Sequence, residues 1–239
     1  MAKRQEHSTI KAIRGCYLFS EVHPESLEPL ARASSIQKYS SDQVIFEVED
    51  EADGLRVVLS GEVRIWTADS HGRQFTLAFL GPGDPFGEIA LLDGLTRTAN
   101  ATSVGMTECL FLPSSAVDKA LASDPALARQ LLYALCETLR HNLATINSFA
   151  FTALDARLAR KLHELALDHA EVAGNIAHFS RQFSQTDLAQ LLGVSREAVN
   201  KQFRVLKHDG LVVQEGGRLI IKDLKRLAAR AEAAEILSG

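Results

Sequence analysis

The hydrophobic pattern of the N-terminal half changes from helical to strand-like beyond residue 33. Residues 8–33 read as short helices around Pro24 and Pro29. Beyond them, glycine-containing turns separate short β-rich runs at Val44–Phe46, Leu55–Leu59, Val63–Trp66, Phe75–Leu80, Ala99–Val104 and Cys109–Leu112. Many short strands with glycine turns predict a sandwich, barrel or roll. Within it, we expect Leu59–Val63 to be a tight turn.

A long helix is predicted to begin at Pro125, because Asp124 offers a capping side chain and proline suits the first helical turn. Its side chains then form a stripe with alternating spacings of three and four residues, namely Leu132, Leu135, Leu139, Asn142, Ile146, Phe149 and Ala153. Such a stripe predicts a dimer seam, although it could instead pack against the chain's own roll. The amide of Asn142 suits two roles, fixing the register of the seam or reaching a ligand beside the helix.

The most specific pattern lies between Phe183 and Leu206. Ser184 and Asp187 form a capping box, Gly193 supplies a sharp turn, and Ser195 caps a second helix. One face of that second helix is apolar, and the other carries Arg196, Glu197, Asn200, Lys201, Arg204, Lys207 and His208. Basic and acidic side chains in its first turns can read guanine and cytosine in the major groove. The pattern predicts a DNA-binding helix-turn-helix, followed over residues 211–221 by a wing whose Arg218 can touch phosphate.

The charge distribution is consistent with a polyanionic partner for the C-terminal part. From Arg157 onward, 13 Lys and Arg stand against 10 Asp and Glu, whereas the preceding part has 13 against 20. The three cysteines, Cys16, Cys109 and Cys136, form no CxxC pair, which argues against a disulfide framework, a zinc site or an iron–sulfur cluster. Neither a signal peptide nor a membrane-spanning run is evident, so we expect a cytoplasmic protein without a membrane partner.

The segment Phe86–Ala99 combines an acid, an arginine, hydroxyls and two glycines between two predicted strands. Glycine gives an anion close access to backbone NH groups, and arginine offers a forked cation to a phosphate. A carboxylate can accept hydrogen bonds from sugar hydroxyls. These features together predict a site for a small nucleotide.

A β-roll, a long helix and a winged helix-turn-helix, in this order, resemble the CRP/FNR (catabolite-activator) family of bacterial transcription regulators. The resemblance covers about residues 15–225, and its sharpest pieces are Gly87-Glu88-Ile89 with Arg97-Thr98-Ala99, and Ser195–Val199. It implies an α+β fold with a double-stranded β-roll in residues 1–123, a dimerisation helix and hinge in 124–154, and a winged helix-turn-helix domain in 155–239. It further implies a homodimer that binds a palindromic, TGTGA-like operator, with RNA polymerase as an additional partner.

By the same resemblance, Phe86–Ala99 is a phosphate-binding cassette for cAMP or cGMP as the allosteric ligand, with no further cofactor. Glu88 would accept from the ribose 2′-OH, Gly87 would present its backbone NH, and Arg97 would pair with the cyclic phosphate. The expected ligand-binding residues are Phe86, Gly87, Glu88, Ile89, Arg97, Thr98, Ala99 and Asn142. The expected DNA-binding residues are Ser184, Ser195, Arg196, Glu197, Asn200, Lys201 and Arg218.

Departures from the family pattern leave the choice between adenine and guanine in the bound nucleotide open. Members that respond to cAMP typically present Thr-Ser or Thr-Asn to the purine, where the nearest residues of this chain are His141-Asn142-Leu143. Arg97-Thr98-Ala99 resembles the cassettes of cGMP-preferring eukaryotic domains. Lys201 replaces a second arginine and makes a single-point contact. Alternatives are an empty pocket, a Glu88–Arg97 pair, or a haem-linked, redox or other metabolite sensor of the same class. An enzyme is disfavoured, since no nucleophile–base pair, Walker loop or metal-ligand spacing is evident.

Overall fold

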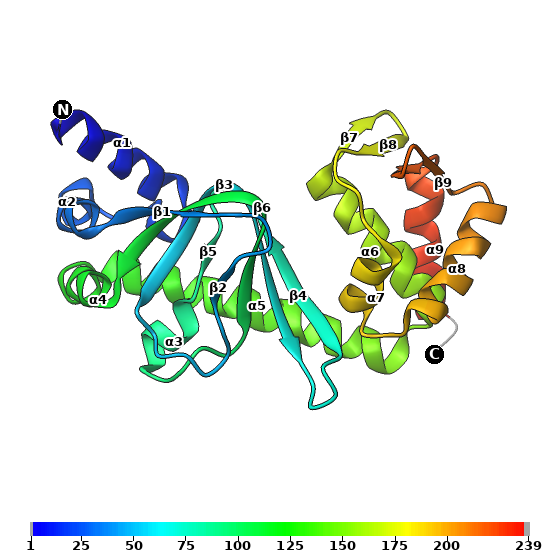
Figure 1. Cartoon of the computed structure of the whole chain (residues 1–239), viewed down its shortest axis with the longest axis horizontal. Coiled ribbons are helices and arrows are strands. Elements are labelled where there is room, and N and C mark those ends of the chain that lie inside the picture. Colours follow the sequence, from blue (N-terminus) through cyan, green and yellow to red (C-terminus); the bar gives the residue numbers. More distant parts are fainter. Residues whose placement is uncertain (1, 237–239) are drawn as a thin grey trace. The chain divides into compact units, whose positions relative to one another are not determined.

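The computed structural model describes residues 2–236, and its backbone contacts divide the chain into two units (Figure 1). The first comprises Met1–His71 and Leu77–Arg140, and the second Gly72–Thr76 and His141–Gly239. The elements up to the long helix are α1 (Ala2–Gly15), the 3-10 helix η1 (Tyr17–Phe19), α2 (Pro24–Ala33), β1 (Ser35–Tyr39), β2 (Val44–Phe46), β3 (Gly54–Ala68), β4 (Gln74–Leu80), β5 (Pro85–Phe86), α3 (Glu88–Asp93), β6 (Asn100–Pro113), α4 (Ser114–Ser123) and α5 (Pro125–Phe151).

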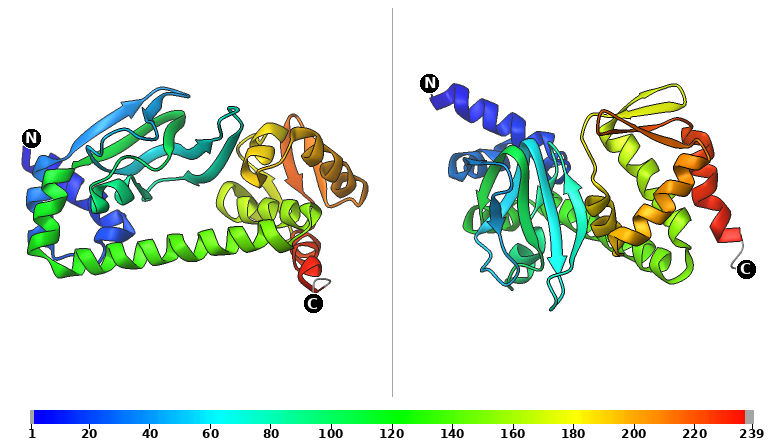
Figure 2. Two further views of the ribbon diagram at one scale, coloured as in Figure 1. Left: turned by 90° about the horizontal axis from the view of Figure 1, so that it is seen from below. Right: turned by 45° about the vertical axis from the view of Figure 1, so that its right-hand side comes forward.

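The first unit contains the predicted β-roll. Its strands are ordered β1-β6-β3-β4, with β2 added to β6 and β5 added to β3. Strands β1, β2 and β3 all run antiparallel to β6. Helices α1, α2 and α4 gather at one end of the roll, and the first part of α5 runs along it (Figures 1 and 2). The core at this end buries Phe19, Leu30, Leu55, Leu112 and Leu127.

Two strands are longer than predicted, and the predicted turn at Leu59–Val63 is wrong. Strand β3 continues through this segment, and its register against β6 shifts between Val58 and Ser60 and again between Ser60 and Glu62. Gly61 has φ +80°, and a Cβ there would come within 2.4 Å of the Met106 carbonyl oxygen. A glycine with positive φ serves a β-bulge as well as a turn, so the glycine signal was misread. The two predicted runs at Ala99–Val104 and Cys109–Leu112 likewise merge into the single strand β6, which begins at Asn100.

The stripe on α5 is largely uncovered within the chain. The helix begins at Pro125 as predicted, and its buried residues Leu127, Leu131 and Ala134 pack into the core of the first unit. The apolar members Leu132, Leu139 and Ile146 are 61%, 60% and 60% exposed. Leu135 is partly covered, and the ring of Phe149 lies 4.2 Å from the guanidinium carbon of Arg157.

The second unit contains the predicted winged helix-turn-helix. Its elements are α6 (Leu154–His169), β7 (Ala170–Ala173), β8 (Ile176–Phe179), α7 (Gln185–Leu192), α8 (Arg196–His208), β9 (Val212–Glu215), β10 (Arg218–Ile221) and α9 (Leu224–Ile236). The four strands are ordered β7-β8-β10-β9, and α9, which the pattern did not reveal, packs on α6. Over residues 2–236, none of the helices has the length and apolar character needed to span a bilayer.

The local signals of the helix-turn-helix are confirmed at atomic detail. Ser184 Oγ accepts from the NH of Asp187 at 3.1 Å, and the NH of Ser184 donates to Asp187 Oδ2 at 2.8 Å. Gly193 ends α7 with φ +63°, and Ser195 Oγ caps α8 by accepting from the NH of Ala198 at 3.2 Å. These caps fix the turn that places α8 beside the wing.

Candidate functional site

Backbone hydrogen bonds hold the Arg97 end of the Phe86–Ala99 segment against Glu49 and Asp50. The NH of Arg97 donates to the Asp50 carbonyl at 2.8 Å, and the NH of Glu49 donates to the Arg97 carbonyl at 2.9 Å. Gly87, with φ +86°, turns the chain from β5 into α3, and Gly94, with φ +70°, ends that helix. Left-handed backbone of this kind favours glycine at both positions. The result places the side chain of Arg97 against the backbone of Gly87.

The guanidinium of Arg97 is held by acceptors of the chain itself. Nη1 donates to the Gly87 carbonyl at 2.8 Å, while Nη2 donates to Asp53 Oδ1 at 2.6 Å and to the Gly54 carbonyl at 2.8 Å. The group also lies 4.4 Å from the centre of the Phe46 ring. Arg97 is only 2% exposed, and its Nε is buried without a hydrogen-bond partner. A buried donor normally finds an acceptor, so this nitrogen is an exception among the polar groups of the roll.

The Glu88 carboxyl occupies the same site without forming an ion pair with Arg97, whose ion pair is with Asp53. Burial raises the pKa of Glu88, and hydrogen bonds from the backbone NH groups of Glu88 and Gly87, together with the charge of Arg97, offset part of that rise. The alternative in which Glu88 and Arg97 satisfy each other is therefore not what the structure contains. Glu88 remains available to a hydroxyl donor.

The other predicted ligand residues differ in their surroundings. Phe86 is buried, and its ring centre lies 5.9 Å from that of Phe46. Ile89 is half-buried, Ala99 is buried, and Thr98 is exposed. Asn142 is exposed on the part of α5 that belongs to the second unit, whereas the cassette belongs to the first. Phe86 and Ala99 thus line the core side of the cassette, and Thr98 is its outward-facing hydroxyl.

Sequence reasoning missed Asp53 and Arg56. Asp53 is the ion-pair partner of Arg97, and Arg56 forms a second ion pair with the same carboxylate. A signal was present, because Arg56 interrupts the apolar run of Leu55, Val57 and Val58, and an arginine buried in a strand requires a partner. The sequence could not reveal which acid serves as that partner.

The alternative of a metal or redox sensor depends on metal-ligand clusters and on reactive thiols. Within residues 2–236, no three or more His, Cys, Asp and Glu side chains converge in a way that could hold a metal ion. Burial raises the pKa of the Cys16 and Cys109 thiols to about 12 in each case. Thiols of this kind are poor nucleophiles, since the thiolate is the reactive form. Cys136 is exposed.

The predicted DNA-binding residues lie at the start of α7, in the first turns of α8 and its cap, and on the wing. Ser184, Ser195, Arg196, Glu197, Lys201 and Arg218 are exposed. Asn200 is half-buried, and its Oδ1 accepts from Gln185 Nε2 at 3.3 Å. A hydrogen bond from its own backbone NH, then one from Ser195, lowers the pKa of Glu197. Glu197 is therefore an ionised acceptor, and the Ser195 hydroxyl is shared between the helix cap and this carboxylate.

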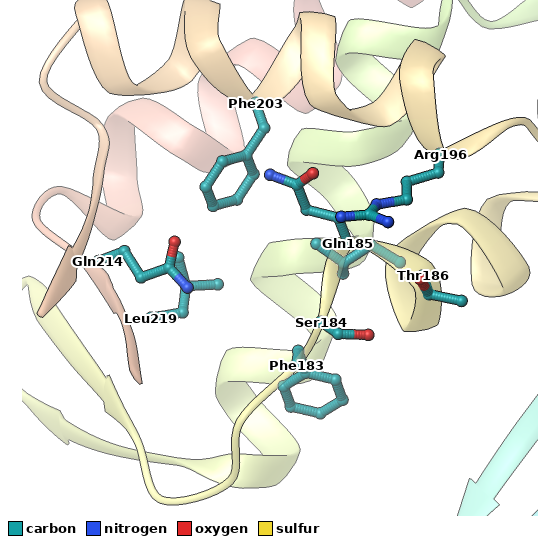
Figure 3. Close-up of a pocket in the computed structure, with 9 residues that line it drawn as sticks. Phe183, Ser184, Gln185, Thr186, Arg196, Phe203, Gln214 and Leu219 are labelled. Carbon is teal, nitrogen blue, oxygen red and sulfur yellow. The ribbon is translucent and has the colours of Figure 1, made fainter. Parts of the chain in front are cut away.

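A hollow of about 350 Å³ lies between the start of α7, α8 and the wing (Figure 3). Its lining includes Ser184 and Arg196, which the sequence pointed to, together with Gln185, Thr186 and Gln214, which it did not. The three additional side chains are polar and come from α7 and the wing, which adjoin α8, the second helix of the helix-turn-helix. They extend the polar surface that this unit offers to a groove or a phosphate backbone.

Comparison with known protein families finds one matching domain in each half of the chain. A cyclic nucleotide-binding domain model matches residues 36–124, and a Crp-like helix-turn-helix domain model matches residues 156–230. The CRP-like cAMP-activated global transcriptional regulator of Mycobacterium tuberculosis is 30% identical over 214 residues, which cover 90% of this chain and 96% of that protein.

Solved structures give the same picture of the fold. A CRP/FNR-family transcriptional regulator from Thermus thermophilus superposes with a TM-score of 0.70 at 28% identity, covering 83% of this chain and 98% of that one. The c-di-GMP responsive global regulator CLP of Xanthomonas campestris has a TM-score of 0.72 at 23% identity, covering 83% and 99%. The fold is thus shared with a regulator that is named as c-di-GMP responsive.

Fold and sites together define a DNA-binding transcription regulator with a cyclic nucleotide-binding domain. The chain belongs to the CRP/FNR family of transcription regulators.

Proposed function

We propose that this regulator is a homodimer whose affinity for operator DNA is controlled by cAMP or cGMP bound at the Phe86–Ala99 cassette. The observation that carries this proposal is the buried, unpartnered Nε of Arg97. Leaving such a donor unsatisfied costs about 1–3 kcal/mol, and the cost is higher for a charged group. An oxygen of a cyclic phosphate removes this cost by accepting from Nε.

The remaining contacts follow from the chemistry of the nucleotide. Glu88 accepts a hydrogen bond from the ribose 2′-OH, and the backbone of Gly87 and Ile89 lies against the phosphate and sugar. Thr98 and Asn142 contact the base and decide between adenine and guanine. The relative from Mycobacterium tuberculosis is named as cAMP-activated, which favours cAMP at an otherwise open choice.

The dimer forms along the stripe on α5. Leu132, Leu139 and Ile146 are each about 60% exposed and have the spacing of a coiled-coil seam. Pairing two copies along this helix removes these side chains from water. The test is Leu139→Lys, which places a charge in the seam, with Ala144→Lys as the control on the opposite side of the helix. Sedimentation should show monomers for the first variant and dimers for the second, and two dimeric variants would refute the seam.

Each protomer then presents one recognition helix to a half-site of a palindromic, TGTGA-like operator. Arg196 and Lys201 donate to guanine, and the ionised Glu197 accepts from cytosine N4. The domain is positioned on the sugar-phosphate backbone of the DNA by Ser184, Ser195, Asn200 and Arg218. RNA polymerase is the further partner through which bound regulator acts on transcription.

Calorimetry tests the ligand and the coupling together. The purified protein is titrated with cAMP and with cGMP, each in the absence and presence of a palindromic TGTGA duplex. We expect micromolar binding of at least one nucleotide, and the duplex should tighten that binding by the factor by which the nucleotide tightens DNA binding, because linkage is reciprocal. Absence of binding heat with both nucleotides would exclude the proposed ligand class.

A further inference from the structure

Arg56 is a buried cation in the central strand of the β-roll. It is 4% exposed, although its neighbours along β3 are apolar. Its guanidinium carbon lies 4.7 Å from the centre of the Phe111 ring and 5.7 Å from that of Phe46. Burying a charge in this way is unfavourable unless the charge is paired and hydrogen-bonded. The position therefore calls for a role that an apolar residue could not fill.

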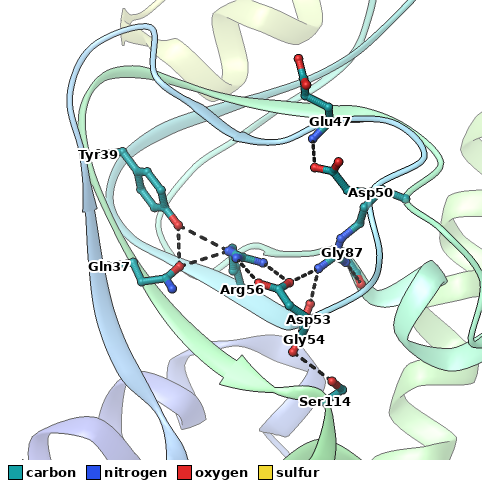
Figure 4. Close-up of polar contacts among 10 residues, drawn as sticks. Gln37, Tyr39, Glu47, Asp50, Asp53, Gly54, Arg56, Gly87 and Ser114 are labelled. Atoms are coloured by element: carbon teal, nitrogen blue, oxygen red, sulfur yellow. Dashed lines mark hydrogen bonds and ion pairs between the residues drawn. The ribbon is translucent and has the colours of Figure 1, made fainter.

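The contacts of Arg56 hold it from both sides (Figure 4). Nη1 donates to Asp53 Oδ1 at 2.9 Å and Nη2 donates to Asp53 Oδ2 at 2.7 Å, so the grip on the carboxylate is bidentate. Nε donates to Gln37 Oε1 at 3.2 Å and lies 3.4 Å from the Tyr39 hydroxyl oxygen. Tyr39 in turn donates to Gln37 Oε1 at 2.5 Å. Bidentate pairing fixes the plane of a carboxylate as well as its distance.

Asp53 links this fixed arginine to the phosphate site. Its Oδ1 accepts from Arg97 Nη2 at 2.6 Å as well as from Arg56, so one carboxylate lies between two guanidinium groups. The Asp53 side chain is 51% exposed, and a half-exposed side chain of this kind is free to rotate unless something holds it. Burial raises the pKa of Asp53, but hydrogen bonds and charge from Arg56, and then from Arg97, outweigh burial and hold that pKa below its ordinary value.

We propose that Arg56 is a positioning residue for ligand binding: it fixes Asp53, and through Asp53 it fixes Arg97 in the orientation that leaves Nε for an anionic ligand. This inference rests on the proposed function of the cassette and assigns to it two residues that do not touch the ligand. Its benefit is preorganisation. A long side chain already ordered in the free protein need not be ordered during binding.

The test is Arg56→Lys, which keeps the positive charge and loses the bidentate pairing with Asp53. Arg64→Lys is the matched control, because Arg64 lies on the same strand with its guanidinium 5.3 Å from the ring of Trp66. We expect Arg56→Lys to weaken cyclic-nucleotide binding about three- to tenfold, the cost of ordering one long side chain. Arg64→Lys should stay within about twofold of the wild type. The deficit should persist at high salt, since it reflects orientation and not long-range charge.

A spectroscopic signature separates positioning from a general loss of stability. The Nε–H resonance of Arg97 in the free protein, assigned by its disappearance in Arg97→Lys, should be a single sharp signal. It should broaden or shift in Arg56→Lys and in Asp53→Asn, while remaining unchanged in Arg64→Lys. Asp53→Asn keeps the size of the side chain and removes its charge, so it tests the link between Arg56 and Arg97 directly.

The outcomes are distinguishable. Equal affinities for Arg56→Lys and Arg64→Lys, or an unaltered Arg97 signal in Asp53→Asn, would overturn the positioning role. Failure of the wild type to bind either nucleotide would instead refute the proposed ligand. The Arg97 resonance of the free protein would still test whether Arg56 and Asp53 fix the Arg97 side chain.

Discussion

Gly87 provides a sharp test of how the cassette holds Arg97. Its backbone has φ +86° and ψ 15°, and a Cβ there would come within 2.5 Å of Arg97 Nη1. Gly94, at the other end of α3, has φ +70° and the same ψ, yet a Cβ there would meet nothing within 4 Å. Gly87→Ala and Gly94→Ala therefore share the backbone strain and differ in the collision with Arg97.

The two variants should differ measurably in stability. Alanine in left-handed backbone costs about 1–2 kcal/mol, which is the loss expected for Gly94→Ala. In Gly87→Ala the guanidinium must also retreat by about 1 Å to reach an ordinary contact distance. This breaks the 2.8 Å hydrogen bond from Nη1 to the Gly87 carbonyl. A hydrogen bond of a charged group contributes about 1.5–3 kcal/mol, so the total loss for Gly87→Ala is about 2.5–5 kcal/mol.

The chain has a convenient reporter for this measurement. Trp66 is its single tryptophan and lies on β3, so urea unfolding followed by fluorescence reports on the roll. Cyclic-nucleotide binding to Gly94→Ala should stay within about twofold of the wild type, and binding to Gly87→Ala should weaken at least about tenfold, which corresponds to about 1.4 kcal/mol. Equal unfolding free energies and equal affinities for the two variants would refute the placement of Arg97 against Gly87.

Three further variants test the acid, the base and the DNA contact. Because burial raises the pKa of Glu88, its ionised form destabilises the fold at neutral pH. Glu88→Gln should therefore raise the melting temperature at pH 7 and change it little below about pH 4.3, the ordinary pKa of a glutamate. It should also weaken nucleotide binding. A gain in melting temperature that does not depend on pH would contradict this reasoning. Thr98→Ala should weaken cGMP more than cAMP by about three- to tenfold in calorimetry, the value of one hydrogen bond, and equal losses would remove Thr98 from base recognition. Lys201→Arg should tighten binding to the operator in fluorescence anisotropy, because a guanidinium can bond guanine O6 and N7 together; the same gain on a duplex lacking that guanine would indicate a backbone contact only.

The helix-turn-helix could be predicted from the sequence because its signals are local. The capping box joins residues three apart, and Gly193 supplies the left-handed residue that ends α7. Each of these features depends on backbone geometry within one or two turns of helix. The apolar face of Val199, Phe203 and Leu206 is buried as its spacing predicts.

The β-roll was predicted in class but not in detail, because its strands depend on distant partners. Gly61 looks like a turn residue until its strand is seen paired with β6 on both sides of the bulge. Strand β1, which was not predicted, owes its place to pairing with residues 107–111. Propensity alone is a weak guide where tertiary pairing decides the structure.

The cassette illustrates the same limit at the level of single side chains. Glu88 and Arg97 could be proposed from the sequence because residue type and spacing carry the chemistry. The partner of Arg97 could not, since Asp53 is 44 residues away and is selected by the roll. Arg56 was visible only as an anomaly in an apolar strand, and its meaning required Gln37, Tyr39 and Asp53 to be placed around it.

The free cassette carries two local costs that one ligand can relieve. Arg97 Nε lacks an acceptor, and the Glu88 carboxylate is partly buried. The proposed cyclic nucleotide would supply both, with its phosphate as the acceptor for Arg97 and its ribose hydroxyl as the donor to Glu88. A ligand that binds only the folded state stabilises it by about 2.7 kcal/mol at a concentration 100-fold above its Kd.

Free phosphate can supply an acceptor to Arg97 Nε, but it lacks the ribose hydroxyl that would donate to Glu88. It should therefore bind this site more weakly than a cyclic nucleotide, and its affinity should not fall in Glu88→Gln.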